Sequence, residues 1–198
     1  MTKVVKQKQR GRPKQNANSL TKQKILLQAT ALQQESGKVP SIRQLAAALQ
    51  VDPMAIYYYF DNKNALLEAL TLTLIEGIYQ PQASELDPLS NHFWKWELTR
   101  LCESYLLLLQ QNAGLLTTLL SMKTHGPAEL FSQRFSLILR PLNLSQEHIE
   151  QALHLLVDYL HGFALAVSCN KTEDPLTMRV DDKVMAFFVD ALAAKSTG

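Results

Sequence analysis

The sequence predicts an all-α protein, and three observations lead to that prediction. Apolar residues recur at helical spacing from Leu20 onward. No alternating apolar run is bounded by turn dipeptides, so strand signals are nearly absent. Of the 198 residues, 46% are hydrophobic, which allows a substantial core in one domain or two small ones.

The formal net charge of +2 conceals an uneven distribution. Residues 1–24 hold eight of the 20 Lys and Arg residues and no acidic residue, which leaves 12 basic and 18 acidic residues in the remainder. A basic tail on a mildly acidic body suits a polyanion, either nucleic acid or a membrane surface. The two cysteines form no CxxC, and no apolar segment follows the N-terminal charges, so we expect no disulfide framework, zinc knuckle or signal peptide.

The first elements follow from capping signals. Residues 1–18 are polar and basic and are expected to form a disordered arm in the isolated protein. A first helix then carries an apolar stripe and ends near Gly37. A second helix is expected to open at Ser41, because Gln44 stands three residues later and completes a capping box.

A short turn at residues 50–52 separates the second helix from a third. Asp52 is expected to cap that helix and Pro53 to occupy its first position, where the missing N–H costs nothing. The third helix is expected to run to Phe60. A longer helix follows and carries apolar residues from Leu66 to Ile78.

A break framed by Pro81 and Pro88 is the expected domain boundary. Residues 1–80 carry 11 basic and 5 acidic groups, whereas residues 81–198 carry 9 and 13. The apolar run 104–122 has three amides at its centre, so it is expected to form two soluble helices meeting at a turn. The predicted organisation is an arm at 1–18, a domain at 19–80 and a helical domain at 81–198.

Residues 41–60, SIRQLAAALQVDPMAIYYYF, have the pattern of a helix-turn-helix. Apolar residues at 45, 49, 51 and 56 would fix the crossing angle of two short helices, and Ala46 is small where they approach most closely. In this motif the second helix enters the major groove of DNA. An ordinary helical hairpin has the same pattern and remains the alternative at this point.

The segment LAAALQVDPMAIYYYFDNKNALLEAL resembles the TetR family of one-component bacterial regulators, within a likeness that spans about residues 20–80. Its most specific part is the aromatic cluster at 57–60 followed by Asn62-Lys63. Gln50 departs from the glycine usual in the family's turn. The resemblance implies a three-helix DNA-binding domain joined by a long helix to a C-terminal ligand-binding and dimerisation domain. It further implies a cytoplasmic, homodimeric repressor that binds a palindromic operator, uses no cofactor and is released by a small apolar ligand.

The resemblance also implies which residues meet DNA. Bases would be contacted by Arg43, Met54, Ala55 and Tyr58, and phosphates by Tyr57, Tyr59 and Lys63, with Ser41 at the same surface. Elementary chemistry supports part of this assignment. Arginine pairs bidentately with guanine, Ala55 or Met54 suits a thymine methyl, and Lys63 begins a helix whose free amides favour phosphate. Core packing is the expected role of Phe60 and the alternative role for Tyr57.

The arm contains KQRGRPK at residues 8–14, which resembles an AT-hook. Arg10 and Arg12 would enter a narrow A·T minor groove, while glycine allows close approach and proline keeps the chain extended. A nonspecific polybasic tail is the alternative.

The region 145–168 is expected to form one helix with two apolar stripes. A helix buried on two sides needs a second partner besides its own core, and another copy of the chain is the economical one. The expected dimer contacts, completed by the last helix, are Leu153, Leu156, Leu160, Phe163, Val167, Val184, Phe187, Phe188 and Ala191. His154, Asp158 and His161 share one face of this helix. They are interpreted as a polar seam of that interface, with a metal site or pH switch as alternatives.

Large apolar groups between 93 and 135 are candidates for an effector pocket, chiefly because the family resemblance implies one, although each could simply pack in the core. Polar groups such as Asn112 and Arg134 lie among them. The candidate pocket residues are Trp94, Leu98, Tyr105, Met122, His125, Phe131, Phe135 and His161.

Two other functional classes are considered. A DNA-bound scaffold or nucleoid-associated protein of the same fold, answering to another protein, is the alternative to a ligand-responsive repressor. An enzyme is not expected, because the sequence has no Ser/His/Asp arrangement, Gly-rich phosphate loop or HExxH motif. No metal site and no membrane association are expected either.

Overall fold

The computed structural model describes residues 20–82, 93–112, 114–122, 126–170 and 179–196, and in these ranges all regular structure is helical. The all-α prediction is therefore confirmed. The helices are α1 (Lys22–Ser36), α2 (Ile42–Leu49), α3 (Pro53–Tyr57), α4 (Lys63–Glu76), α5 (Phe93–Gln111), α6 (Leu115–Ser121), α7 (Gly126–Leu139), the 3-10 helix η1 (Arg140–Leu142), α8 (Gln146–Cys169) and α9 (Asp182–Lys195).

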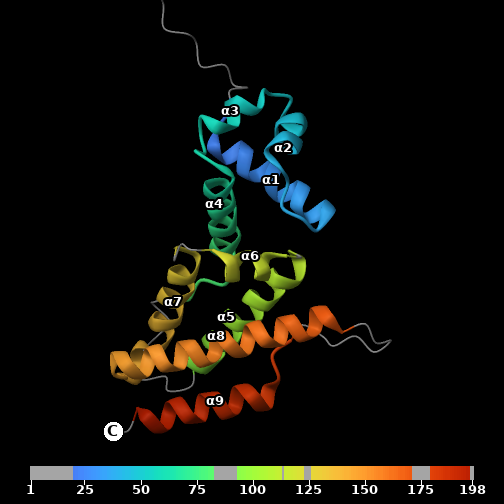
Figure 1. Ribbon diagram of the computed structural model, residues 1–198. Coiled ribbons are helices and arrows are strands. Elements are labelled where there is room, and N and C mark those ends of the chain that lie inside the picture. The colour runs from blue at the N-terminus through green and yellow to red at the C-terminus, as the bar shows by residue number, and fades with distance from the viewer. Residues whose placement is uncertain (1–19, 83–92, 113, 123–125, 171–178, 197–198) are drawn as a thin grey trace, which may run out of the picture.

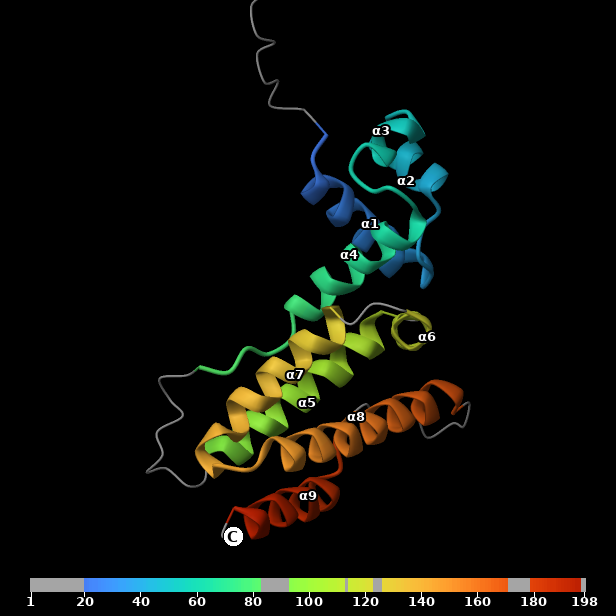
Figure 2. The same ribbon diagram turned by 60° about the vertical axis from the view of Figure 1, so that its left-hand side comes forward.

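The helices form a head and a body at opposite ends of the molecule (Figure 1). The head consists of α1, α2 and α3 around the start of α4. Helix α4 then runs from the head to the body, where α5 and α7 lie next to each other. The long helix α8 and the last helix α9 lie side by side at the end farthest from α3, as the turned view also shows (Figure 2).

The predicted caps of the head helices are confirmed. The Ser41 amide donates to Gln44 Oε1 at 2.9 Å and the Gln44 amide to Ser41 Oγ at 3.2 Å, which is the reciprocal capping box. The Asp52 carboxylate accepts from the Met54 amide at 2.7 Å, with Pro53 at the first position of α3. Local sequence therefore determines where α2 and α3 begin.

Helix α3 ends at Tyr57, three residues earlier than predicted. The chain still turns tightly, because the Tyr58 amide donates to the Met54 carbonyl and the Phe60 amide to the Ile56 carbonyl. Phe60 is buried in the core of the head, as expected, so the chain bends inward there before α4 begins. Burial of that ring, rather than helix propensity, sets the end of the recognition segment.

The turn between α2 and α3 has the left-handed residue that the family's glycine would provide. Gln50 has φ 55° and ψ 43°, and a Schellman motif forms around it. The Val51 amide donates to the Ala46 carbonyl at 3.0 Å and the Gln50 amide to the Ala47 carbonyl at 3.2 Å. A side chain in this region costs on the order of 1 kcal/mol, so the tight turn is retained at some strain.

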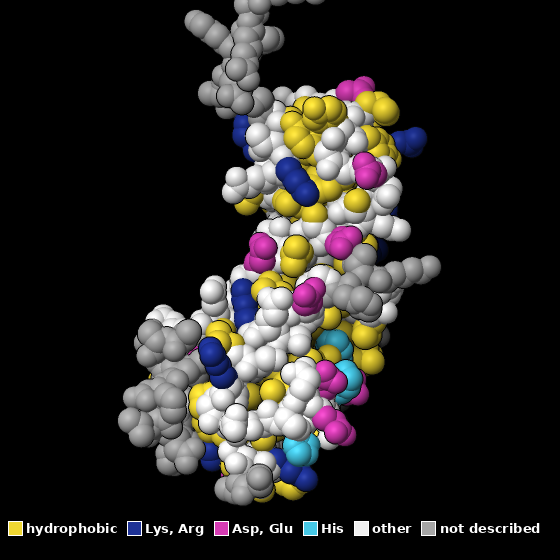
Figure 3. Space-filling model, turned by 90° about the vertical axis from the view of Figure 1, so that its left-hand side faces the viewer, with side chains coloured by type: hydrophobic (Ala, Val, Ile, Leu, Met, Phe, Trp, Pro, Cys, Tyr) yellow, Lys and Arg dark blue, Asp and Glu magenta, His cyan; other side chains and the backbone are white. Residues whose placement is uncertain are grey.

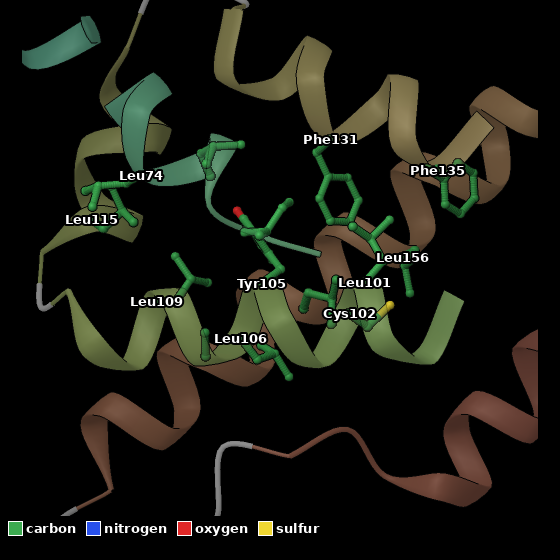
Figure 4. Packing of buried hydrophobic residues seen from close by; sticks show 14 of the residues in the cluster. Leu74, Leu101, Cys102, Tyr105, Leu106, Leu109, Leu115, Phe131, Phe135 and Leu156 are labelled. Atoms are coloured by element: carbon green, nitrogen blue, oxygen red, sulfur yellow. The ribbon is translucent and has the colours of Figure 1, made fainter. Parts of the chain in front are cut away.

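One continuous core links the head to the body. In the head, Ile25, Leu45 and Ile56 are completely buried between α1, α2 and α3. In the body, α5 supplies the central layer, with α7 and α8 packed against it. Figure 4 shows Tyr105 of α5 near Phe131 of α7, and Leu74 of α4 beside Leu115 of α6, so the core continues into the linking helix.

Arg134 of α7 closes the C-terminal end of α4. Its side chain is 8% exposed, and its guanidinium donates to the carbonyls of Ile78 at 2.8 Å and Glu76 at 3.1 Å. The carbonyls of Ile75 and Tyr79 lie at 3.4 Å. The last carbonyls of a helix have no partners within it, so one buried cation satisfies the end of α4 and complements its dipole.

We predict that Arg134→Met destabilises the protein by about 2–4 kcal/mol, because it leaves buried carbonyls without donors. Urea unfolding followed by circular dichroism measures the free energy of unfolding. Arg140→Met, which removes an exposed arginine of η1, serves as the matched control and should change stability by less than about 0.5 kcal/mol. Equal effects of the two substitutions would contradict the capping role.

Candidate nucleic-acid interface and effector cavity

The recognition segment exposes large side chains at the tip of the head. Met54 is 70% exposed and Tyr58 is 85% exposed, whereas Ile56 between them is buried and fixes α3 to the head. Tyr57 is also exposed. Figure 3 shows hydrophobic side chains gathered at this end of the molecule, with both basic and acidic side chains around them. Exposed apolar groups of this size on a short helix are available for base edges and thymine methyls.

The remaining predicted contact residues lie around α3. Ser41, Arg43 and Lys63 are exposed, and Lys63 is the first residue of α4, whose cap Asn62 accepts from the Ala65 amide. Ala55 is half-buried. The side chains of Arg43 and Lys63 are thus open to solvent, and their contacts with bases and phosphate stay predictions.

Tyr59 has an internal hydrogen-bond partner instead of a free hydroxyl. Its phenol donates to the Leu20 carbonyl, just before α1, and its ring lies 5.3 Å from that of Tyr58 in an edge-on arrangement. Nearby, the Lys22 ammonium lies 5.3 Å from the centre of the Phe60 ring. The Tyr59 hydroxyl, which was predicted to donate to a phosphate, instead donates within the protein. This hydrogen bond holds the start of the folded chain against the end of the recognition segment.

The charge of the head is balanced. Residues 20–82 contain five basic groups and five acidic groups, so their formal charge is zero. The six basic groups of residues 1–19 therefore account for the whole surplus of the N-terminal part. Arg10 and Arg12 belong to that arm and lie outside the described residues.

A cavity of about 620 Å³ lies in the body beside the end of α4. Tyr105, Met122, Phe131 and His161 line it, as four of the eight predicted pocket residues. Trp94, Leu98 and Phe135 pack in the core without lining it, and His125 lies outside the described residues. The other lining residues are Ile75, Leu119, Leu120, Pro127, Ala128, Glu129, Ser132, Leu153, His154, Val157 and Asp158.

The polar row of α8 faces this cavity. His154, Asp158 and His161 all line it, and His154 and Asp158 are also exposed, so the interpretation as a polar interface seam stays a prediction. The Tyr105 hydroxyl lies 2.7 Å from His161 Nε2, and the two rings are 5.8 Å apart. Among the residues whose placement is described, no cluster of three or more side chains is arranged to hold a metal ion.

Burial controls the protonation of the cavity's aromatic pair. It raises the pKa of the Tyr105 phenol, and it lowers the pKa of His161 although the nearby Asp158 carboxylate acts in the opposite direction. Both groups are therefore neutral at neutral pH. The phenol can donate its hydrogen to the imidazole, and its oxygen keeps a lone pair for a ligand.

The predicted dimer residues divide between the core and the surface. Leu156 is 2% exposed and Leu160 and Phe188 are also buried in the protomer, while Leu153 lines the cavity. Phe187 is 77% exposed, Val184 and Ala191 are exposed, and Phe163 and Val167 are half-buried. Leu155 and Leu165 of α8, which the prediction omitted, are exposed as well.

Helix α8 is unusually apolar for a helix with so much exposed surface. It is the helix, among those in the described ranges, that is long and apolar enough to cross a membrane, with a mean hydropathy of 1.4. Only 22% of that apolar window is buried inside the protein. The same helix carries three histidines, two glutamates and an aspartate, which are costly to place in lipid.

Comparison with known proteins identifies the head. The sequence model of "Bacterial regulatory proteins, tetR family" matches residues 25–70, which run from α1 through the recognition segment into α4. Residues 25–70 therefore form a TetR-family domain. Its helix-turn-helix is thus a DNA-binding element of a transcriptional regulator, and the hairpin alternative is set aside.

Solved structures share the fold of most of the chain. BioQ with its double-stranded DNA operator is 19% identical, with a TM-score of 0.66 over 89% of this chain and 99% of that one. Apo ActR from Streptomyces coelicolor is 17% identical, with a TM-score of 0.74 over 90% and 97%. ActR of the same organism in complex with actinorhodin is 16% identical, with a TM-score of 0.69 over 90% and 95%.

The TM-scores establish a shared fold of head and body. A search of curated protein sequences finds no significant match to this chain.

Several cavity residues were not predicted from the sequence. Ile75 is on α4, and Leu119 and Leu120 are on α6, so the cavity draws on segments far apart in the chain. On α8 one signal was available: positions 154, 157, 158 and 161 share a helical face. That spacing identified the polar row, but only the fold determines that the row lines a cavity.

We predict that His161→Gln weakens the acid sensitivity of the fold. An unfolded histidine binds its proton near pH 6.5, whereas folded His161 stays neutral to lower pH because its pKa is lowered. The unfolded state therefore binds more protons, and the contribution of neutral His161 to stability is complete above about pH 6.5 and is lost as the pH falls below it. Chemical unfolding between about pH 7 and pH 5 should show a smaller loss in the variant. The same loss in both proteins would refute this role.

Proposed function

We propose that this TetR-family regulator is a homodimeric repressor that binds a palindromic operator and is released by a small, mostly apolar ligand. The observation that carries the proposal is the recognition segment. Met54 and Tyr58 project from a helix whose inner residue, Ile56, is buried, and exposed Arg43 stands beside them. This is the arrangement that a major-groove reader needs.

The exposed apolar residues of α8 and α9 support dimerisation. Leu155, Leu165 and Phe187 are large and exposed on two helices that lie side by side at the end of the body (Figures 1 and 2). A four-helix contact between two copies would bury them. A two-fold dimer also presents two recognition helices, which match successive major grooves when they are about 34 Å apart.

The cavity's position supports control by a ligand. Ile75 of α4 is part of its wall, and α4 carries the recognition segment at its other end. A ligand that binds better to one orientation of α4 than to another changes operator affinity by that difference in binding free energy. BioQ in complex with DNA and ActR in complex with actinorhodin share this fold. Each holds one of the two kinds of partner proposed here, DNA in BioQ and a small molecule in ActR.

The arm is proposed to bind the minor groove next to the recognition helix. Arg10 and Arg12 would do this through the AT-hook-like sequence. The hydrogen bond from Tyr59 to the Leu20 carbonyl supports the proposal, because it holds the point where the arm begins beside the recognition segment. The arm would therefore start close to the operator.

Selection of bound fragments from a random DNA pool tests the proposed function directly. A dimeric reader should enrich a palindrome whose half-sites are about one helical turn apart. Arg43→Ala should then weaken binding to that palindrome by about tenfold or more while nonspecific affinity changes little. Lys195→Ala, which removes an exposed cation of α9, is the matched control. Absence of an enriched sequence would rule out the specific reader.

The selected DNA also tests the arm. Deletion of residues 1–17 removes six basic groups and should flatten the slope of log affinity against log salt concentration. An unchanged slope would remove the arm from the interface.

We further predict that Phe187→Asp produces a monomer, because an aspartate in a four-helix contact cannot be solvated. Light scattering after size exclusion measures the mass, and operator binding should weaken in parallel. Leu27→Asp places the same charge at an exposed leucine of α1 and should leave the dimer intact. A Phe187→Asp protein that remains dimeric would exclude this face as the interface.

A further inference from the structure

We propose that the effector is an amphipathic organic cation, an apolar molecule carrying a protonated amine. This inference rests on the proposed function, since it specifies the ligand of the same cavity. It comes from the charges and aromatic rings on the cavity wall.

Both formally charged groups on the described cavity wall are carboxylates. Glu129 belongs to the first turn of α7 and Asp158 to the middle of α8, so the negative charges come from two different helices. None of the described lining residues is Lys or Arg. On the face shown in Figure 3, His and acidic side chains gather on one side of the body. A concave surface with charges of one sign concentrates ligands of the opposite sign.

His161 does not compensate for this negative charge at neutral pH. Burial keeps His161 neutral, and its Nε2 faces the Tyr105 hydroxyl at 2.7 Å. A ligand carboxylate would thus meet Glu129 and Asp158 with no described cation on the wall to pair with. An ammonium would instead gain from both.

The aromatic rings supply the second set of contacts for a cation. Tyr105 lies 5.0 Å from Phe131 and 5.8 Å from His161 between ring centres, so three rings adjoin in one wall. An ammonium near such faces is stabilised by the ring quadrupoles. The Tyr105 oxygen, whose hydrogen can be donated to His161, accepts a further N–H bond.

The rest of the wall fits an apolar body rather than a small inorganic ion. Leu119, Leu120 and Met122 come from α6 and the residue after it, and Val157 comes from α8. A volume of about 620 Å³ accommodates a drug-sized molecule. The combination of this apolar volume with two carboxylates and three rings is what specifies the ligand class.

Three probes of one shape test the inference: biphenyl-4-methylamine, biphenyl-4-methanol and biphenyl-4-carboxylate. Calorimetric titration of the full chain at neutral pH measures the affinity of each. We expect the amine to bind about tenfold more tightly than the alcohol, and the carboxylate to bind more weakly than both. Equal affinities, tighter binding of the carboxylate, or no binding of any probe would overturn the inference.

Variants test whether the preference for the amine over the alcohol arises in the cavity. Asp158→Asn and Glu129→Gln should each reduce amine affinity severalfold and leave alcohol affinity unchanged. Glu150→Gln removes an exposed carboxylate of α8 that does not line the cavity and should keep the full preference. If all three variants lose the preference equally, the charge of the whole body rather than the cavity selects the probe, and the inference fails.

The DNA selection described above separates this inference from the proposed function. An enriched palindrome without an amine preference overturns the cation inference and leaves the DNA reader in place. An amine preference without any enriched DNA overturns the repressor and retains the cation site.

Discussion

The hydrogen bonds from the Arg134 guanidinium to the end of α4 are the interaction on which the arrangement of head and body depends. A helix end buried without donors is costly, and α4 ends inside the protein against α7. The cation fixes this end, while the other end of α4 carries the recognition segment. The carbonyl of Ile75 is one of its acceptors, and the Ile75 side chain lines the cavity. Ile75 therefore belongs both to the end of α4 that Arg134 caps and to the wall of the cavity.

A second contact between head and body lies at α6. Gly37 ends α1, and a side chain added at Gly114, before α6, would place its Cβ 3.8 Å from the Gly37 carbonyl oxygen. Gly114 itself has φ 82°, a conformation that favours glycine. Because α6 also contributes Leu119 and Leu120 to the cavity, two of the cavity's walls touch the head. A ligand in this cavity would thus lie against two elements that contact the head.

Local signals in the sequence predicted the head better than the body. The caps at Ser41 and Asp52 involve residues two or three positions apart, so sequence spacing alone determines them. Arg134 was grouped with candidate pocket residues, yet its partners lie 55 to 59 positions away, a distance that no local pattern reports. Helical spacing likewise defined two apolar stripes on α8 but not which one faces inward, and the structure buries Leu156 and Leu160 in the core.

The head has no net charge and the arm is strongly basic, so the two parts would contribute differently to DNA binding. Five cations and five anions give residues 20–82 little long-range attraction to a polyanion, so their affinity depends on close fit. The arm, with six cations, would supply attraction that is indifferent to sequence and persists between sites. In kinetic terms, shortening the arm would slow the search along a chromosome more than it would alter the choice of the final site. Evolution could thus adjust how fast such a protein finds its target without changing what it recognises.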